Sequence, residues 1–257
     1  MLVLTSASGA PGVTTTALGL VLQWPDEAVL MDADRSASHA VLAGYLQGRS
    51  PQGLGMQGLI HAHRERRDLR HAFEENRLLL PPPPLPPTSE APPPHWFVPG
   101  FTHLQAVDHF ENVWTPLQEP LREHPGDVIV DAGRIGHRGL PEALLGAATS
   151  VALVCRTSLV SLAALRLYIP PLVEAAPPGQ VGLVLVGPGR PYRSREVTEQ
   201  FRLPVWAEIP WEPRQAADLS DGADLAANWS RQALARGYAR AAQNLREAIR
   251  AGLDHRA

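Results

Sequence analysis

A glycine-containing loop near the N-terminus has the composition of a phosphate-binding loop. Residues 8–16 read S-G-A-P-G-V-T-T-T; they follow an apolar run at 2–5 and precede an apolar, helix-compatible run at 17–22. In a strand–loop–helix unit, the N–H groups at the helix N-terminus bind phosphate oxygens. The common loop, G-x-x-x-x-G-K-[ST], adds a lysine for the phosphates and a hydroxyl for Mg²⁺. Val13 stands in the place of that lysine, so the loop predicts the shape of a nucleotide site without its usual charge.

The chain contains no lysine, because all 23 of its Lys and Arg residues are arginines. In a tight phosphate loop the planar guanidinium does not replace the compact ammonium group. Arg35, Arg134 and Arg156 each follow a predicted strand or its acidic end, and any of them could bring positive charge to phosphates. Arg134 is the best placed of the three. The alternative, which we favour, is that Arg134 forms a structural ion pair with Asp32 or Asp131.

Three carboxylates follow apolar runs that predict buried strands. Asp32 and Asp34 come after the run at 28–31, and Asp131 ends the run at 127–131. A hard cation with phosphate ligands requires oxygen donors of this kind. Together with the hydroxyls of Thr14 and Thr15, these carboxylates predict the ligands of a magnesium ion.

Short uncharged apolar runs alternate with helical segments along the whole chain. Such alternation predicts an α/β fold, with a mainly parallel twisted sheet and helices on both faces. Ligands bind at the carboxyl ends of the strands in such folds, which places the loop and the carboxylates on one rim. The strands are predicted at 1–6, 28–31, 95–100, 127–131, 150–155, 181–186 and 205–210. The helices are predicted at 17–22, 36–48, 58–75, 105–123, 140–146, 158–174, 194–201 and about 225–253.

Length and composition predict one domain, 1–257, with a net charge of −3. The proline-rich stretch 81–94 cannot form a helix or a central strand, so we expect an extended insert that acts as a spacer or as a docking segment. The lone Cys155 excludes an intrachain disulfide and a four-cysteine metal site, and we expect no zinc. No apolar run is long enough to span a membrane, and the first strand starts at residue 2, so we expect a cytoplasmic protein.

In its motifs the chain resembles the MinD/ParA family of deviant Walker ATPases, P-loop proteins of the SIMIBI class. The family loop K-G-G-x-G-K-T-T matches residues 8–15 in position, and the family D-x-D matches 32–34. Residues 97–100 resemble its v-l-P-G strand, 127–131 its Walker B strand, and 208–212 its I-P-x-D segment. The resemblance extends over nearly the whole chain and implies the P-loop NTPase fold.

The resemblance also implies roles for individual residues. Thr14 would bind Mg²⁺ and Thr15 the α-phosphate. Asp34 would orient the attacking water, Asp32 would support Mg²⁺ or that water, and Asp131 would hold Mg²⁺ through a water. The remaining nucleotide contacts implied are Gly9, Ala10, Gly12, Val13, Arg134, Pro210 and Trp211.

Several departures from the family pattern fall on the side of the phosphates and the base. The family's signature lysine is Ser8, its second loop glycine is Ala10, and Pro11 has no N–H to offer. The asparagine that reads adenine is replaced by a glycine and a proline at 187–188. We therefore expect ATP and Mg²⁺ to bind weakly or not at all, with little hydrolysis.

The function that we expect is that of a pseudo-ATPase adaptor, which positions a protein partner in partition, division or a pilus or secretion system. The alternative is a switch that binds ATP weakly, dimerises and hydrolyses slowly. Protein partners and a homodimer are expected in either case. We expect no direct nucleic-acid binding, since the arginines and histidines at 61–71 are interspersed with carboxylates. We expect no membrane association either, since the predicted C-terminal helix has mixed charge and few bulky apolar residues.

Overall fold

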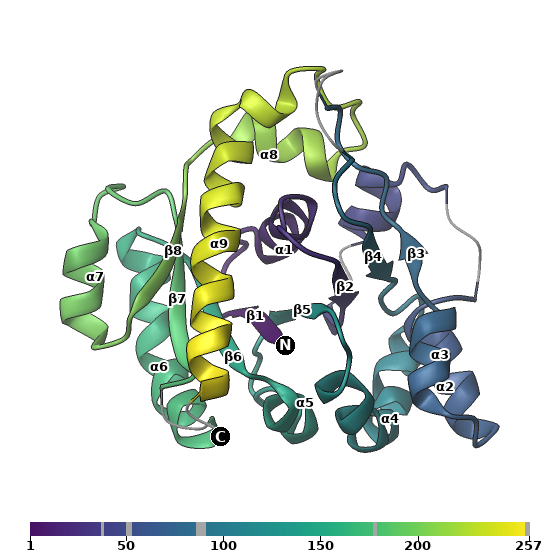
Figure 1. The fold of residues 1–257 in the computed structure, drawn as a ribbon. Coiled ribbons are helices and arrows are strands. Elements are labelled where there is room, and N and C mark those ends of the chain that lie inside the picture. The colour runs from purple at the N-terminus through teal and green to yellow at the C-terminus, as the bar shows by residue number, and fades with distance from the viewer. Residues whose placement is uncertain (37–38, 50–52, 86–90, 177–178, 255–257) are drawn as a thin grey trace.

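The fold is built on one sheet of eight strands, in the order β3-β4-β2-β5-β1-β6-β7-β8 (Figure 1). A computed structural model describes residues 1–36, 39–49, 53–85, 91–176 and 179–254. Every neighbouring pair of strands is parallel except β3 and β4. The strands are β1 (Leu2–Ser6), β2 (Ala28–Asp32), β3 (Leu78–Leu79), β4 (His95–Val98), β5 (Asp127–Arg134), β6 (Ser150–Arg156), β7 (Val181–Val186) and β8 (Val205–Ile209).

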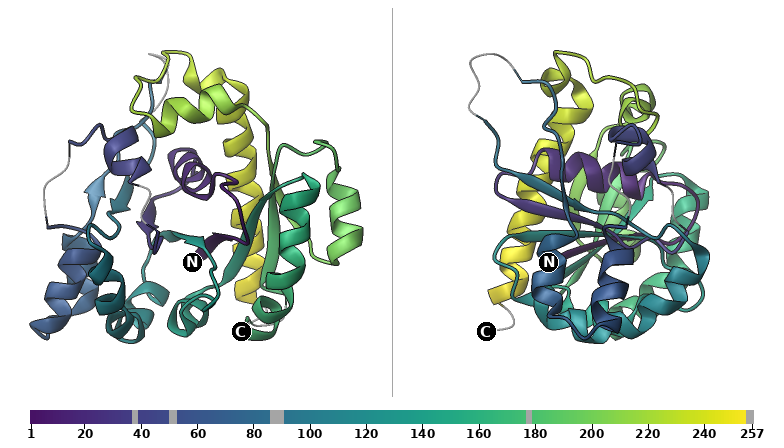
Figure 2. Two further views of the ribbon diagram at one scale, coloured as in Figure 1. Left: turned by 180° about the vertical axis from the view of Figure 1, so that it is seen from behind. Right: turned by 90° about the vertical axis from the view of Figure 1, so that its right-hand side faces the viewer.

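Helices cover both faces of the sheet, as predicted (Figure 2). One face is covered by α2 (Met56–Arg64), α3 (Leu69–Glu75), α4 (Leu104–Arg122), α5 (Glu142–Ala147), α6 (Leu159–Ala175) and α7 (Ser194–Phe201). The other face is covered by α1 (Val13–Leu22), the π-helix η1 (Ala40–Tyr45), α8 (Pro213–Ser220), the 3₁₀ turn η2 (Trp229–Arg231) and α9 (Ala233–Asp254).

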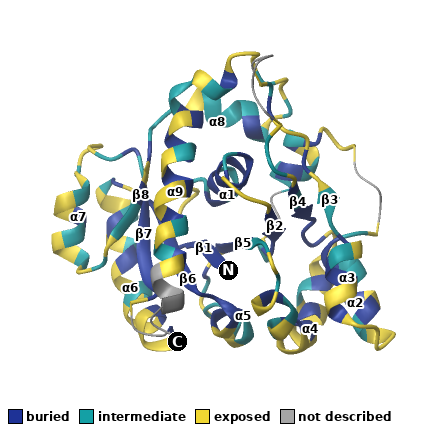
Figure 3. Cartoon of the chain, viewed as in Figure 1, coloured by how far each residue is buried: buried dark blue, intermediate teal, exposed yellow. Residues whose placement is uncertain are grey.

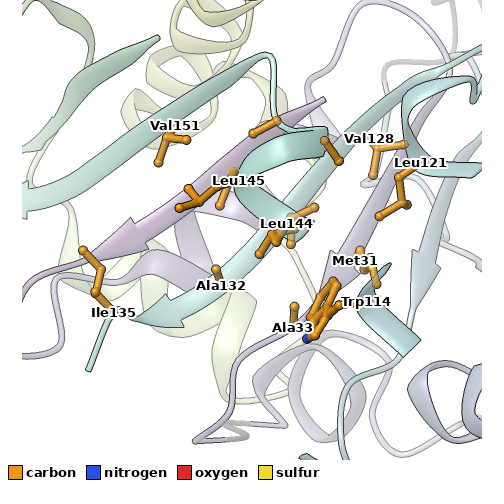
Figure 4. Packing of buried hydrophobic residues seen from close by; sticks show 14 of the residues in the cluster. Met31, Ala33, Trp114, Leu121, Val128, Ala132, Ile135, Leu144, Leu145 and Val151 are labelled. Atoms are coloured by element: carbon orange, nitrogen blue, oxygen red, sulfur yellow. The ribbon is translucent and has the colours of Figure 1, made fainter. Parts of the chain in front are cut away.

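Successive side chains of the central strands point to opposite faces of the sheet, and this divides the core into two clusters. In β1, Leu2 and Leu4 pack under α1 and α9, whereas Val3 packs under the helices of the opposite face. Because both faces are covered, the central strands β1, β2, β6 and β7 are continuous apolar runs, and Figure 3 shows them almost wholly buried. Figure 4 shows part of the second cluster, with Leu144 and Leu145 of α5 lying over β5.

The single helix predicted over 58–75 is wrong. The chain forms two helices there, because Arg66 adopts a left-handed backbone with φ of 56° and ends the first one. Asp68 then caps α3, since its carboxylate accepts hydrogen bonds from the N–H groups of Arg70 and His71. The aspartate followed by an apolar residue was the available signal for this break.

The C-terminal helix begins at Ala233, later than the predicted start near 225. Trp229 is fully buried in the 3₁₀ turn η2, and Gln232 then leaves helical geometry before α9 starts.

The predictions also missed β3 and α8. In the proline-rich stretch, residues 81–85 and 91–94 form no regular structure, and 86–90 lie outside the described residues. Within the described ranges, the structure contains no helix long and apolar enough to cross a membrane.

Candidate functional site

The loop between β1 and α1 has the backbone geometry that an anion-binding loop requires. Gly9 and Gly12 adopt positive φ angles of 70° and 91°, which a residue with a side chain rarely adopts. Gly12 is the N-cap of α1, and as a glycine it has no side chain to cap the first turn. The predicted loop is therefore formed, with helix amides at its end available for an acceptor.

Val13 is a core residue rather than a loop residue. Only 7 % of its surface is exposed, and it packs among the apolar residues under α1 and α9. A loop lysine at this position would extend along the loop toward phosphates. The apolar side chain instead anchors the start of α1, so no side chain of the loop itself carries positive charge.

Two arginines bind the loop from the strands on either side of β1. Arg134 at the end of β5 donates from Nη2 to the carbonyl oxygen of Gly9 at 2.9 Å. Arg156 at the end of β6 donates from Nη2 to the carbonyl oxygen of Ala10, also at 2.9 Å. The ion pair that we favoured for Arg134 with Asp32 or Asp131 is absent among the described residues, because its guanidinium is held by the loop carbonyl.

A cavity of about 340 Å³ opens beside the loop, between α1, α8 and the ends of β7 and β8. Trp211 forms part of its wall, and its ring lies 4.7 Å from the guanidinium carbon of Arg156 and 5.4 Å from that of Arg190. The predicted contact residues that line the cavity are Ala10, Gly12, Thr15, Pro210 and Trp211. Those that do not line it are Gly9, Val13, Thr14 and Arg134.

The carboxylates are brought together at the same rim. Asp32 and Asp131 are register partners on the neighbouring strands β2 and β5. Asp131 is 1 % exposed; its Oδ1 accepts the N–H of Gly133 at 2.9 Å, and its Oδ2 has no hydrogen-bond partner of ordinary geometry in the described part of the chain. The N–H of Asp34 donates to Asp32 Oδ1 at 3.2 Å.

Burial raises the pKa of both strand-end carboxyls. The pKa of Asp131 rises to about 6 through burial, opposed by hydrogen bonds from the Thr14 side chain and the Gly133 N–H. The pKa of Asp32 lies well above its usual range through burial and the nearby charge of Asp131. The effect of desolvation on these two pKa values therefore outweighs that of the hydrogen bonds. A cation bound at this rim would favour the ionised forms of Asp32 and Asp131.

Two glycines make room for these carboxylates. A Cβ at Gly133 would lie 2.1 Å from the carboxyl carbon of Asp34, and one at Gly100 would lie 2.6 Å from that of Asp32. No group of three His, Cys, Asp or Glu side chains is placed to hold a metal ion by itself within the described ranges. A magnesium ion would therefore need phosphate and water ligands beside Thr14 and Asp131.

The contacts of Arg156 and Arg190 with the ring of Trp211 were not predicted, although Arg156 and Trp211 were each considered on their own. Arg156 was considered because it follows a strand, but its stacking on Trp211 has no signal in the sequence. Tyr238 of α9 lines the same cavity and was not among the predicted site residues. Arg35 is directed away from the loop, since it pairs with Glu111 at 3.6 Å. Cys155 is buried at the end of β6, and burial raises the pKa of its thiol to about 12.

Comparisons with known proteins give structural neighbours only. No protein-family model and no curated sequence matches the chain. A ParA family ATPase from Chlorobium tepidum is similar with a TM-score of 0.72 and 14 % identity, over 94 % of this chain and 98 % of that one. A chain of the MinC:MinD cell division protein complex of Aquifex aeolicus has a TM-score of 0.68 and 13 % identity, over 96 % and 95 %.

A third neighbour is the septum site-determining protein MinD of Pyrococcus horikoshii, complexed with Mg-ADP. Its TM-score is 0.66 at 14 % identity, over 95 % of this chain and 94 % of that one. At these identities the likeness concerns the fold, and it extends over nearly the entire length of each chain. The mainly parallel sheet, the loop between β1 and α1 and the rim carboxylates thus occur in a chain with the fold of the MinD and ParA ATPases.

Proposed function

We propose that the protein is a MinD/ParA-like adaptor, which positions a protein partner and whose nucleotide site binds weakly and hydrolyses little. The observation that carries the proposal is the buried, apolar Val13 at the position of the loop lysine. Because the chain has no lysine at all, no other residue of that type can replace it.

The remaining donors fit a nucleotide with its metal. The N–H groups at the start of α1 suit phosphate oxygens, and the buried carboxylate of Asp131 suits a metal-bound water. The neighbouring MinD of Pyrococcus horikoshii is complexed with Mg-ADP, which supports the same class of ligand here. In this proposal Thr14, Asp32 and Asp131 lie on the metal side, while Gly9, Ala10, Gly12, Val13 and Thr15 surround the phosphates through their backbone.

Loss of the lysine acts more strongly on turnover than on binding. A hydrogen bond from a charged group contributes about 1.5–3 kcal/mol, so its loss weakens binding by roughly tenfold to a hundredfold. A cation on the oxygens of the transferring phosphoryl group contributes about 10³–10⁵ in rate in systems that use an arginine for it. Asp34 would orient the attacking water, but the charge that develops in the transition state would lack its usual loop cation.

A protein partner fits this role better than a nucleic acid or a membrane. The MinC:MinD structure is a complex of two proteins, which supports a protein partner for a chain of this fold. We propose a homodimer as a further assembly, and we place the protein in the cytoplasm. Arg67, in the turn between α2 and α3, pairs with Glu75, and His71 of α3 pairs with the same carboxylate, so the basic groups around α3 are interspersed with acidic ones.

Two parallel measurements test the adaptor proposal. Calorimetry with Mg-ATP measures binding, and a phosphate-release assay on the same preparation measures turnover. We expect the heat of Mg-ATP binding to be weak or undetectable. We expect phosphate to be released no faster than in a protein-free control. Micromolar binding together with steady phosphate release would contradict the adaptor proposal.

A second candidate is the dimerising switch, and the retained carboxylates favour it. Asp32, Asp34 and Asp131 would have no use in a site that had lost its ligand altogether. In that case Mg-ATP would convert a monomer to a dimer, which light scattering after gel filtration would detect. An unchanged mass with and without Mg-ATP would exclude the switch.

A further inference from the structure

We propose that Arg156, at the end of β6, supplies the positive charge for phosphates bound at the loop, and that Trp211 holds its guanidinium in place. The inference deepens the proposed function, because it rests on that proposal's nucleotide site and assigns a cation to it. The ligand class is a di- or triphosphate, which carries more negative charge than the loop amides alone can balance.

The guanidinium of Arg156 is held between two groups. One of its N–H groups donates to the carbonyl of Ala10, and its central carbon lies 4.7 Å from the ring of Trp211. A guanidinium offers five N–H donors, so the single bond to Ala10 leaves four for an incoming anion. Stacking on an aromatic face restrains the long side chain, which reduces the entropy that it loses when a ligand binds.

Arg156 is the one cationic side chain among the residues that line the cavity beside the loop. Glu212 is the acidic one; its carboxylate lies near the amide of Gln215, at 3.4 Å, rather than near an arginine. Arg156 forms no ion pair with a carboxylate in the described part of the chain. Its charge is therefore not neutralised by a neighbouring side chain.

The other arginines are less well placed. Arg134 makes a matching bond to the carbonyl of Gly9, but it does not line the cavity. Arg190 approaches the ring of Trp211 at 5.4 Å and does not line the cavity either. Arg35 is paired with Glu111 at 3.6 Å.

A second feature also points to a ligand at the end of α1. Asp131 is almost completely buried, yet its Oδ2 has no hydrogen-bond partner of ordinary geometry among the described residues. Buried polar atoms of this kind are rare unless a ligand, ion or water completes them. Arg156 on the β6 side and Asp131 on the β5 side thus flank the loop, as the phosphate and metal sides of one ligand would require.

The test compares three arginine variants of the full chain. Binding of Mg-ATP and of tripolyphosphate is measured by calorimetry and by tryptophan fluorescence, with Trp211→Phe identifying the signal of that ring. Arg156→Gln removes the charge from an exposed side chain, Arg156→Lys retains it, and Arg190→Gln is the matched control, because Arg190 approaches the same ring without lining the cavity. Circular dichroism confirms that each variant is folded.

We expect Arg156→Gln to weaken binding of both ligands by about tenfold or more, and Arg190→Gln to weaken it by less than about threefold. Arg156→Lys should bind between wild type and Arg156→Gln. The inference is overturned if Arg156→Gln binds within about threefold of wild type, or if Arg156→Lys binds as weakly as Arg156→Gln.

Failure of this inference is distinguishable from failure of the adaptor proposal. If the wild type binds neither Mg-ATP nor tripolyphosphate at about 5 mM, the role of Arg156 is refuted, while an adaptor without turnover remains supported. If Arg156→Gln loses affinity but the wild type releases phosphate steadily, the role of Arg156 stands and the adaptor proposal fails.

Discussion

Asp131→Asn should stabilise the protein at neutral pH, although it removes a residue of the candidate site. The carboxyl is buried, and its pKa rises from 3.8 to about 6 on folding. Asparagine keeps an oxygen for the Gly133 N–H and carries no charge. Above pH 6 the folded wild type therefore holds a buried carboxylate, which the variant does not.

The magnitude follows from the pKa shift. A difference of roughly two units corresponds to about 3 kcal/mol, at about 1.4 kcal/mol per unit. Because the folded pKa is the higher one, the folded state binds more protons than the unfolded state between pH 3.8 and 6. Wild-type stability should therefore fall as the pH rises through this window and stay low above it.

Urea unfolding of wild type and variant at two pH values measures this difference. The free energy of unfolding of Asp131→Asn should exceed that of wild type by about 3 kcal/mol near pH 7.5, and the two should converge near pH 4. Asp108→Asn, which removes an exposed carboxylate from α4, is the control and should change stability by less than about 0.5 kcal/mol. A difference that does not depend on pH, or a variant less stable at pH 7.5, would refute the reasoning.

Three further predictions concern close contacts and the cavity. Gly133→Ala should cost about 2 kcal/mol of unfolding free energy, because its Cβ would lie 2.1 Å from the Asp34 carboxyl carbon; Gly139→Ala, with positive φ but open space, should cost about 1 kcal/mol. Gly19→Ala should cost about 2 kcal/mol, because its Cβ would lie 2.2 Å from the Tyr238 ring, and an unchanged urea midpoint would contradict this. ATP and GTP should bind within about threefold of each other in competition calorimetry, because no Asn or Gln side chain of the described residues lines the cavity; a tenfold preference would contradict this.

Most of the framework could be predicted because it depends on local patterns. The apolar runs at β2, β5, β6 and β7 are continuous, since both faces of the sheet are buried, and the carboxylates follow them directly. The π-helix η1, the two-residue strand β3 and the break after α2 depend on tertiary contacts or on single backbone angles, which periodicity does not reveal.

The candidate site was predictable in its loop and carboxylates, but the contacts of its arginines were not. Because the loop and the carboxylates each follow a predicted strand, the sequence already placed Gly12, Asp32 and Asp131 at one rim of the sheet. The contacts of Arg134 depend on the register of β5 with β1, which pairs Ser6 with Arg134 and brings the guanidinium to the loop carbonyl. The stacking of Arg156 on Trp211 joins the ends of β6 and β8, and nothing in either segment alone indicates it.

The most direct test of the central claim is a phosphorus NMR time course of Mg-ATP with a stoichiometric amount of protein. The nucleotide site described here predicts that the ATP resonances shift or broaden on binding at high concentration. No line of inorganic phosphate should grow beyond that of a protein-free control. A phosphate line that grows steadily, with loss of the γ-phosphate resonance, would contradict the account.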